Sequence, residues 1–133
     1  MKSMNKSLSI FINILVYIIA LMAVGYTWQL LPDSPVLIKL YMADALGTIV
    51  VFIFSRIFDN SSMYDPYWSV QPFVMAVFLA WPLRGLDILE TIVLFLVLIY
   101  GLRLTLNFYR DWSGIGHEDW RYQDFRRAFP RMY

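Results

Sequence analysis

The chain has 133 residues, of which 59% are hydrophobic and only 16% are charged. A soluble domain of this size has too little interior to bury so much apolar surface, so the composition excludes a small soluble module. The formal net charge is +1 and cysteine is absent, which excludes disulfides and cysteine-based metal sites. A single histidine gives no reason to expect another kind of metal site, and the short, aromatic-rich basic tail excludes a nucleic-acid-binding surface.

Four apolar segments are each about long enough to cross a bilayer, which needs about 20 helical residues. They are Leu8–Leu31, Val36–Phe58, Trp68–Leu83 and Leu86–Phe108. The third is the shortest and carries prolines, which predicts a tilted, kinked or partly re-entrant helix. The sequence therefore predicts an all-α integral membrane protein, with four transmembrane helices in residues 1–110.

The distribution of lysine and arginine predicts how the chain is oriented. The N-terminus, the second loop with Arg56 and the C-terminal tail hold most of the basic residues, whereas the other two loops hold only Lys39 and Arg84. Cytoplasmic loops carry the excess of basic residues in membrane proteins. We therefore predict that both termini are cytoplasmic. A cleaved signal peptide is the alternative for the first segment, although its apolar run is longer than a signal core.

Two charged residues, Lys39 and Asp44, fall in the first half of the second segment. Lys39 is close to the helix end, where its long side chain can reach the membrane interface. Asp44 is deeper, and a charge at such depth costs about 2.5–3.5 kcal/mol. We expect Asp44 to face other helices or a polar cavity, either for a function or only with its hydrogen bonds satisfied. A small ion-coupled transporter with Asp44 and Glu90 as intramembrane carriers is a further alternative.

The fourth segment has polar residues at both ends. At its start, Asp87 can cap the helix and pair with Arg84, while the role of Glu90 stays open. Near its end, a stripe with i, i+4, i+7 spacing contains Arg103, Asn107 and Arg110. Such a donor-rich stripe suits phosphate or carboxylate groups. The alternative is a basic anchor at the cytoplasmic end.

Residues 111–133 form a basic and aromatic tail. Trp112, Trp120 and Tyr122 are amphipathic rings of the kind found at the level of lipid headgroups. From Tyr122 an apolar stripe continues through Phe125 and Phe129, and the arginines of the tail lie beside this stripe. This pattern predicts a helix that lies on the cytoplasmic face of the membrane.

Three motifs, in order, resemble the DUF1295 family over roughly residues 50–127. They are Ser62-Met63-Tyr64-Asp65-Pro66-Tyr67-Trp68-Ser69-Val70-Gln71-Pro72, then Arg103-Leu-Thr-Leu-Asn107, then Glu118-Asp119-Trp120-Arg121-Tyr122. That family is similar to the steroid 5-alpha-reductase-like membrane enzymes and, more distantly, to isoprenylcysteine methyltransferases. Taken without the resemblance, Asp65-Pro66 is only a turn that starts a helix.

The resemblance implies an α-helical membrane enzyme that uses NADPH to reduce an activated carbon–carbon double bond in a hydrophobic, lipid-like substrate. In that chemistry a donor near the substrate carbonyl stabilises the developing enolate. The implied cofactor-binding residues are Arg103, Asn107, Arg110, Asp119, Arg121 and Tyr122. The candidate catalytic residues are Asp65, Tyr67 and Glu90, with Trp68 helping to shape the site. A glutamate–tyrosine pair of the steroid-reductase kind would join Glu90 to Tyr64 or Tyr67.

The resemblance also implies that the chain corresponds to an N-terminal portion. Full-length relatives continue through further transmembrane helices that carry much of the cofactor pocket. We therefore expect the chain to need a missing or separately encoded C-terminal half as its partner before it holds NADPH. The alternative from a different class is a non-enzymatic four-helix membrane protein that acts in assembly or as a scaffold.

Overall fold

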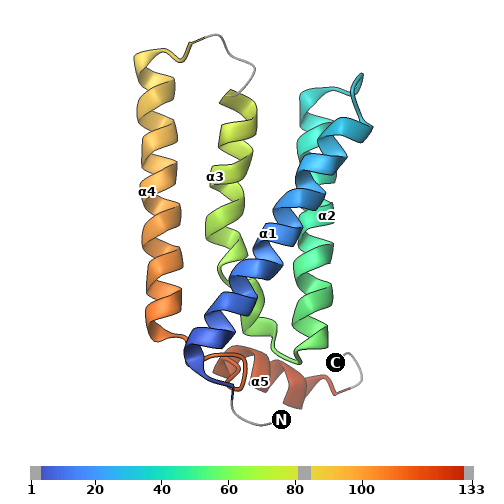
Figure 1. Ribbon diagram of the computed structural model, residues 1–133, viewed down its shortest axis with the longest axis vertical. Coiled ribbons are helices and arrows are strands. Elements are labelled where there is room, and N and C mark those ends of the chain that lie inside the picture. Colours follow the sequence, from blue (N-terminus) through green and yellow to red (C-terminus); the bar gives the residue numbers. More distant parts are fainter. Residues whose placement is uncertain (1–3, 81–84, 131–133) are drawn as a thin grey trace.

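The computed structural model describes residues 4–80 and 85–130, and within them the chain is helical with no strand. The elements are α1 (Lys6–Leu30), α2 (Val36–Ile57), the 3-10 helix η1 (Ser61–Tyr64), α3 (Tyr67–Ala80), α4 (Ile88–Asp111) and α5 (Trp120–Ala128). The four longer helices stand side by side with α1 crossing obliquely, and α5 lies across one end (Figure 1). The predicted all-α class is confirmed for these residues.

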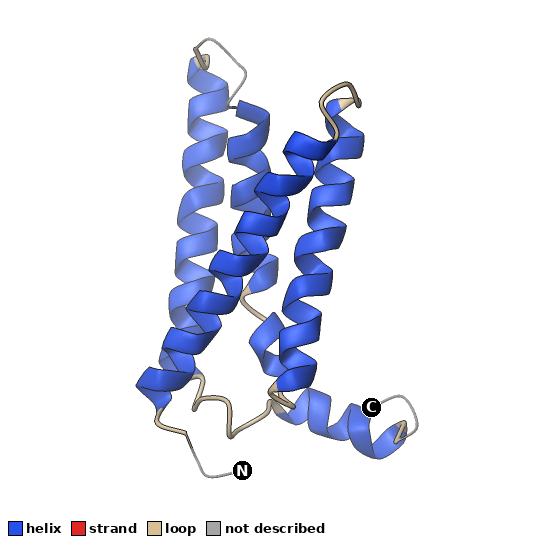
Figure 2. Ribbon diagram, turned by 45° about the vertical axis from the view of Figure 1, so that its right-hand side comes forward, coloured by secondary structure: helices blue, strands red, loops and turns tan. Residues whose placement is uncertain are grey.

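The helices begin where the sequence supplies caps. Asn5 accepts the backbone N–H of Ser7 at the start of α1, and Asp119 accepts that of Arg121 at the start of α5. Pro35 directly precedes α2, where a missing backbone N–H costs nothing. The loop after α2 and the loop before α5 both lie at the end of the bundle where α1 begins (Figure 2).

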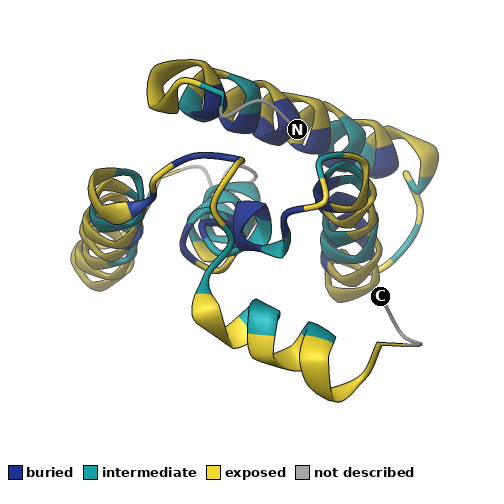
Figure 3. Ribbon diagram, turned by 90° about the horizontal axis from the view of Figure 1, so that it is seen from below, coloured by how far each residue is buried: buried dark blue, intermediate teal, exposed yellow. Residues whose placement is uncertain are grey.

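The polarity of the bundle is opposite to that of a soluble protein. Ser9 and Asn13 are fully buried between the helices, whereas Leu37 and Ile88 are 77% and 82% exposed. Seen from below, the buried positions of α1 and α2 face inward, and most of α4 is exposed (Figure 3). Polar groups inside and apolar side chains outside are what a lipid environment requires. The outer surface is therefore suited to a bilayer.

The prediction of four membrane-spanning helices is corrected to three. Among the described residues, α1, α2 and α4 are long and apolar enough to cross a membrane. In contrast, α3 has 14 residues, or about 21 Å at the usual rise per residue. The predicted third segment also included residues 81–83, which lie outside the described residues. The chain before α3 forms η1 and a turn instead of lengthening the helix.

Lys39 and Asp44, the two charged residues in the first half of α2, both have partners. The amine of Lys39 donates to the carbonyl oxygen of Pro32 at 2.6 Å and lies 5.4 Å from the ring centroid of Trp28. It thus reaches the loop that follows α1, as the sequence predicts. Asp44 accepts a hydrogen bond from Tyr67 of α3, so the prediction that it faces another helix is confirmed.

Close packing of α3 against α4 depends on Gly101. A Cβ atom at this position would stand 2.6 Å from the backbone oxygen of Ser69, which is too short for any side chain. The hydroxyls of Ser69 and Thr105 share a hydrogen bond of 2.8 Å one turn further along α4. Small residues and interhelical hydroxyl bonds are the usual means by which helices associate in lipid.

Replacing Gly101 with alanine should push α3 away from α4. We expect Gly101→Ala to destabilise the folded chain by about 1–3 kcal/mol, since overpacking forces the backbones apart. The measurement is the thermal unfolding midpoint in detergent. Gly25→Ala is the matched control, because a Cβ atom at Gly25 meets nothing within 4 Å. Equal midpoints for the two variants would contradict this packing.

Candidate functional site

The segment that contains η1 is held from two sides by buried hydrogen bonds. The carbonyl oxygen of Met63 accepts hydrogen bonds from Asn13 Nδ2 at 3.1 Å and from the Tyr17 hydroxyl at 2.8 Å. The amide oxygen of Asn13 in turn accepts the hydroxyl of Tyr109 at 2.7 Å. Since Asn13 and Tyr17 belong to α1 and Tyr109 to α4, these bonds join both helices to η1.

Asn60 joins η1 to the loop before α5. Its side-chain amide donates to the carbonyl oxygens of Ile115 at 2.8 Å and His117 at 3.0 Å. Its side-chain oxygen accepts the backbone N–H of Ser62 at 2.9 Å. The Ser62 hydroxyl then accepts the backbone N–H of Asp119 at 2.7 Å. The loop of residues 112–119 is therefore fixed beneath the bundle.

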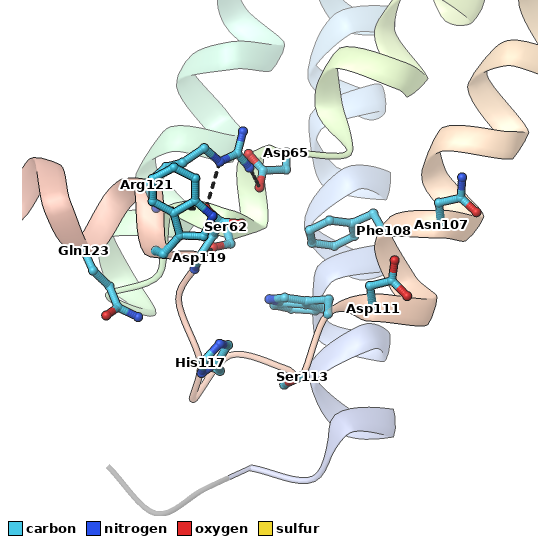
Figure 4. A pocket seen from close by; sticks show the side chains of 12 residues that line it. Ser62, Asp65, Asn107, Phe108, Asp111, Ser113, His117, Asp119, Arg121 and Gln123 are labelled. Carbon is cyan, nitrogen blue, oxygen red and sulfur yellow. Dashed lines mark hydrogen bonds and ion pairs between the residues drawn. The ribbon is translucent and has the colours of Figure 1, made fainter.

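These contacts surround a cleft of about 550 Å³ at the C-terminal end of α4. Asn107, Phe108 and Asp111 line it from α4, while Asp65 and Arg121 line it from the opposite side (Figure 4). The remaining lining residues are Ser62, Trp112, Ser113, His117, Asp119, Trp120 and Gln123. Segments that are more than 50 residues apart in sequence thus share one polar cavity.

Asp65 is the centre of the polar contacts in this cleft. One carboxylate oxygen accepts the Tyr122 hydroxyl at 2.5 Å, and the other accepts the Arg121 guanidinium at 3.3 Å. Arg121 also donates to Asp119 through Nε at 2.8 Å. Burial raises the pKa of the Asp65 carboxyl, while the bonds from Tyr122 and Arg121 act in the opposite direction. Burial and the adjacent Asp65 raise the pKa of Tyr122, so its hydroxyl remains a donor.

A second ion-pair cluster holds the far side of α5. Arg126 pairs with Glu118 through Nε at 2.7 Å and with Asp59 through Nη1 at 2.6 Å. Glu118 also accepts the backbone N–H of Ser61 at 2.7 Å. No residue of α5 is buried, so these polar contacts, with those of Tyr122 and Arg121, position this helix.

Only part of the predicted phosphate-binding stripe reaches the cleft. Of its three residues only Asn107 lines the cleft. Arg103 is exposed on α4, and Arg110 is exposed and paired with Asp111 at 2.8 Å. The spacing places all three on one side of the helix, but the cleft begins only at its last turn. The lining carries three aspartates and one arginine, and that arginine is already paired. The donor set does not fit the phosphates of a dinucleotide.

Tyr67 and Asp44 form a hydrogen-bonded pair that sequence reasoning did not join. The Tyr67 hydroxyl lies 3.0 Å from the backbone oxygen and 3.3 Å from the carboxylate of Asp44. Gly47 permits this approach, because a Cβ atom there would stand 2.5 Å from the Tyr67 oxygen. The sequence did indicate that Asp44 needs a polar partner, because it lies deep in the second apolar segment. Its partner depends on how α3 sits beside α2, which no local pattern gives.

Glu90 is placed away from the other candidates. It forms a capping box with Asp87, in which Glu90 N–H donates to Asp87 at 2.7 Å and Asp87 N–H donates to Glu90 at 2.9 Å. This first turn of α4 is at the opposite end of the bundle from η1 (Figure 1). The expected pairing of Glu90 with Tyr64 or Tyr67 is therefore wrong. The predicted pairing of Asp87 with Arg84 is not tested, because Arg84 lies outside the described residues.

The aromatic residues of the tail divide between core and surface. Trp112 is buried and stacks on Phe108 with ring centroids 5.2 Å apart, so its predicted place among lipid headgroups is wrong. The indole is drawn inward because the loop after α4 turns back under α1. Trp120, Phe125 and Phe129 remain exposed, as an interfacial helix requires.

The described residues form an α-helical protein with three helices long and apolar enough to cross a membrane and a polar site at one end of the bundle. A family model described as "Protein of unknown function (DUF1295)" matches residues 51–133, which is more than half of the chain. The chain belongs to the DUF1295 family. No curated protein and no solved structure matches it.

Removing the Tyr122 hydroxyl should loosen α5. We expect Tyr122→Phe to weaken its docking by about 1–2 kcal/mol, because a hydrogen bond to a carboxylate is lost. Backbone amides of residues 120–128 should then exchange about tenfold faster, as followed by hydrogen–deuterium exchange. Tyr26→Phe is the control, since Tyr26 is exposed on α1. Unchanged exchange in Tyr122→Phe would contradict the docking described.

The docking of α5 should also depend on pH through Asp119. The hydrogen bond from Arg121 lowers the pKa of Asp119, so its stabilisation is present at neutral pH and is lost as the pH falls through the folded value. Asp119→Asn keeps the helix cap and removes the charge. The difference in amide protection between the wild type and this variant should begin to shrink near the ordinary carboxyl pKa of about 4, and should vanish only once the pH is below the lowered pKa of folded Asp119. The Asp119 charge is also one of the causes that raise the pKa of Asp65, so the variant removes that contribution as well. A difference that persists into acid would contradict this role.

Proposed function

We propose that this chain forms the substrate-binding, N-terminal portion of a membrane reductase that uses NADPH. Its substrate would be a lipid-like or steroid-like molecule whose double bond is conjugated to a carbonyl group, as in a 3-oxo-5-alpha-steroid 4-dehydrogenase-like reaction. The observation that supports it most is the Tyr67 hydroxyl, held against the Asp44 carboxylate between the helices of the bundle. Intramembrane carboxylates are costly and are usually functional.

Tyr67 is suited to polarise a carbonyl oxygen. Its hydroxyl proton can rotate about the carbon–oxygen bond, so the donor now directed at Asp44 can turn to a ligand. The ring is fixed by stacking on Tyr64 at 5.2 Å and by a tilted contact with Tyr17 at 6.4 Å. A fixed donor in a water-poor site stabilises negative charge that develops on an oxygen. Asp44 is then a positioning residue for Tyr67.

The cleft beside Asp65 would receive the nicotinamide end of the cofactor, which supplies the hydride. Carboxylate and amide groups such as Asp65, Asp119 and Asn107 accept hydrogen bonds from ribose hydroxyls and pair with a carboxamide. The phosphates find no unpaired guanidinium there, so their contacts must come from other residues. Asp65 and Tyr67 are two positions apart, which brings cofactor and carbonyl sites together.

Loss of the Tyr67 hydroxyl should weaken binding of an enone. We expect Tyr67→Phe to bind 4-cholesten-3-one about 3- to 10-fold less tightly in lipid nanodiscs, as one hydrogen bond is worth about 0.5–1.5 kcal/mol. The dissociation constant is measured by titration, with Tyr100→Phe on the exposed face of α4 as control. Absence of binding by the wild type, or equal binding by both variants, would favour the scaffold alternative.

The cleft should distinguish the two ends of the cofactor. We expect the chain to bind reduced nicotinamide riboside and to bind adenosine 2′,5′-bisphosphate much more weakly, because the lining has three aspartates and its one arginine is already paired. Saturation-transfer NMR in nanodiscs compares the two ligands. Asn107→Ala should reduce the riboside signal, whereas Arg103→Ala, outside the cleft, should not. Preferential binding of the bisphosphate, or equal losses in the two variants, would refute this assignment.

A further inference from the structure

A small cavity lies between α1 and α3, next to the Tyr67–Asp44 pair. Its free volume is about 10 Å³, which is close to the space that one water-sized oxygen occupies. Tyr17, Ala20, Leu21 and Val24 line it from α1, at the i, i+3, i+4, i+7 positions of one helix face. Tyr67, Val70 and Gln71 line it from the facing side of α3.

Gln71 brings an unsatisfied donor to this cavity. The residue is only 6% exposed, and its side-chain nitrogen is buried without a hydrogen-bond partner among the residues that the structure describes. The Tyr17 hydroxyl donates to Met63 and the Tyr67 hydroxyl donates to Asp44, so Tyr67 can serve a ligand only by turning its proton away from Asp44. A buried amide donor left unpaired is unfavourable, and in native proteins such a group calls for a ligand or another explanation.

We propose that this cavity binds the carbonyl oxygen of the lipid-like ligand, with Gln71 and Tyr67 as its two donors. The inference rests on the proposed function and adds a second donor and a route of approach. Gln71 and Tyr67 are one helical turn apart, so an amide N–H and a phenol can converge on one oxygen. The apolar ligand would approach between α1 and α3, where Leu21 is exposed on the outer surface.

The lining favours a neutral acceptor over other ligands. It contains no charged residue, which argues against a phosphate or a metal ion. The space admits one oxygen atom, and the groups around it are an amide donor, two phenols and apolar side chains. A carbonyl oxygen attached to an apolar body meets all of these conditions. A single trapped water is the other source of an acceptor oxygen, and the experiment separates the two.

The test uses 4-cholesten-3-one labelled with ¹³C at its carbonyl carbon, added to the chain in lipid nanodiscs. Isotope-edited infrared spectroscopy should show a carbonyl band at lower frequency than the same probe in empty nanodiscs. We expect Gln71→Leu to reduce this shift and to weaken binding about 3- to 10-fold. Gln29→Leu, at an exposed position of α1, should behave as the wild type.

Two further readouts decide between outcomes. Gln71→Leu without ligand should unfold at the same temperature as the wild type or slightly higher, because it removes an unpaired buried amide. A clearly lower midpoint would overturn the inference, since the amide would then serve the fold. If Gln71→Leu keeps the full shift and affinity while Tyr67→Phe loses both, the cavity holds only water or nothing, and the proposed function stands alone. If neither variant changes the band, both proposals fail.

Discussion

The backbone carbonyl of Met63 is buried in an apolar bundle, and the site depends on how that oxygen is satisfied. Asn13 and Tyr17 of α1 both donate to it, so the 3-10 helix is fixed against α1. An unpaired carbonyl in such surroundings would cost several kcal/mol, so the two bonds strongly favour a single arrangement. The position of η1 then fixes both Asp65 and Tyr67, which follow it directly in the chain.

Two polar sites of different character therefore share one anchoring segment. On one side of η1, Asp65 meets Tyr122 and Arg121 in a cleft that is lined by three aspartates and one arginine. On the other, Tyr67 reaches Asp44 among apolar side chains. The proposed reaction, between a polar cofactor and a lipid, would use such a boundary, since one reactant dissolves in water and the other in the bilayer. No residue of α5 is buried, and its hydrogen bonds and ion pairs contribute to holding it at the cleft.

The helices follow from apolar runs and caps, and so could be predicted from the sequence, whereas their pairings could not. The apolar length of α1, α2 and α4 and the acids at the start of α4 are local signals. By contrast, the bond between Asp44 and Tyr67 and the close approach at Gly101 depend on how separate helices pack. Helical periodicity places Arg103, Asn107 and Arg110 on one face of α4. It does not say which turn of that helix lies against a cavity. Likewise, the aromatic character of Trp112 does not show whether its ring lies in the protein core or at the membrane interface.

The most direct test of this account is the hydrogen bonding of the Met63 carbonyl in a bilayer. Solid-state NMR of the chain, labelled at the Met63 carbonyl carbon and the Asn13 side-chain nitrogen, measures it in lipid. The account predicts a through-space correlation between these two nuclei and a carbonyl shift typical of an oxygen with two donors. The absence of this correlation, together with the shift of an unbonded carbonyl, would contradict it.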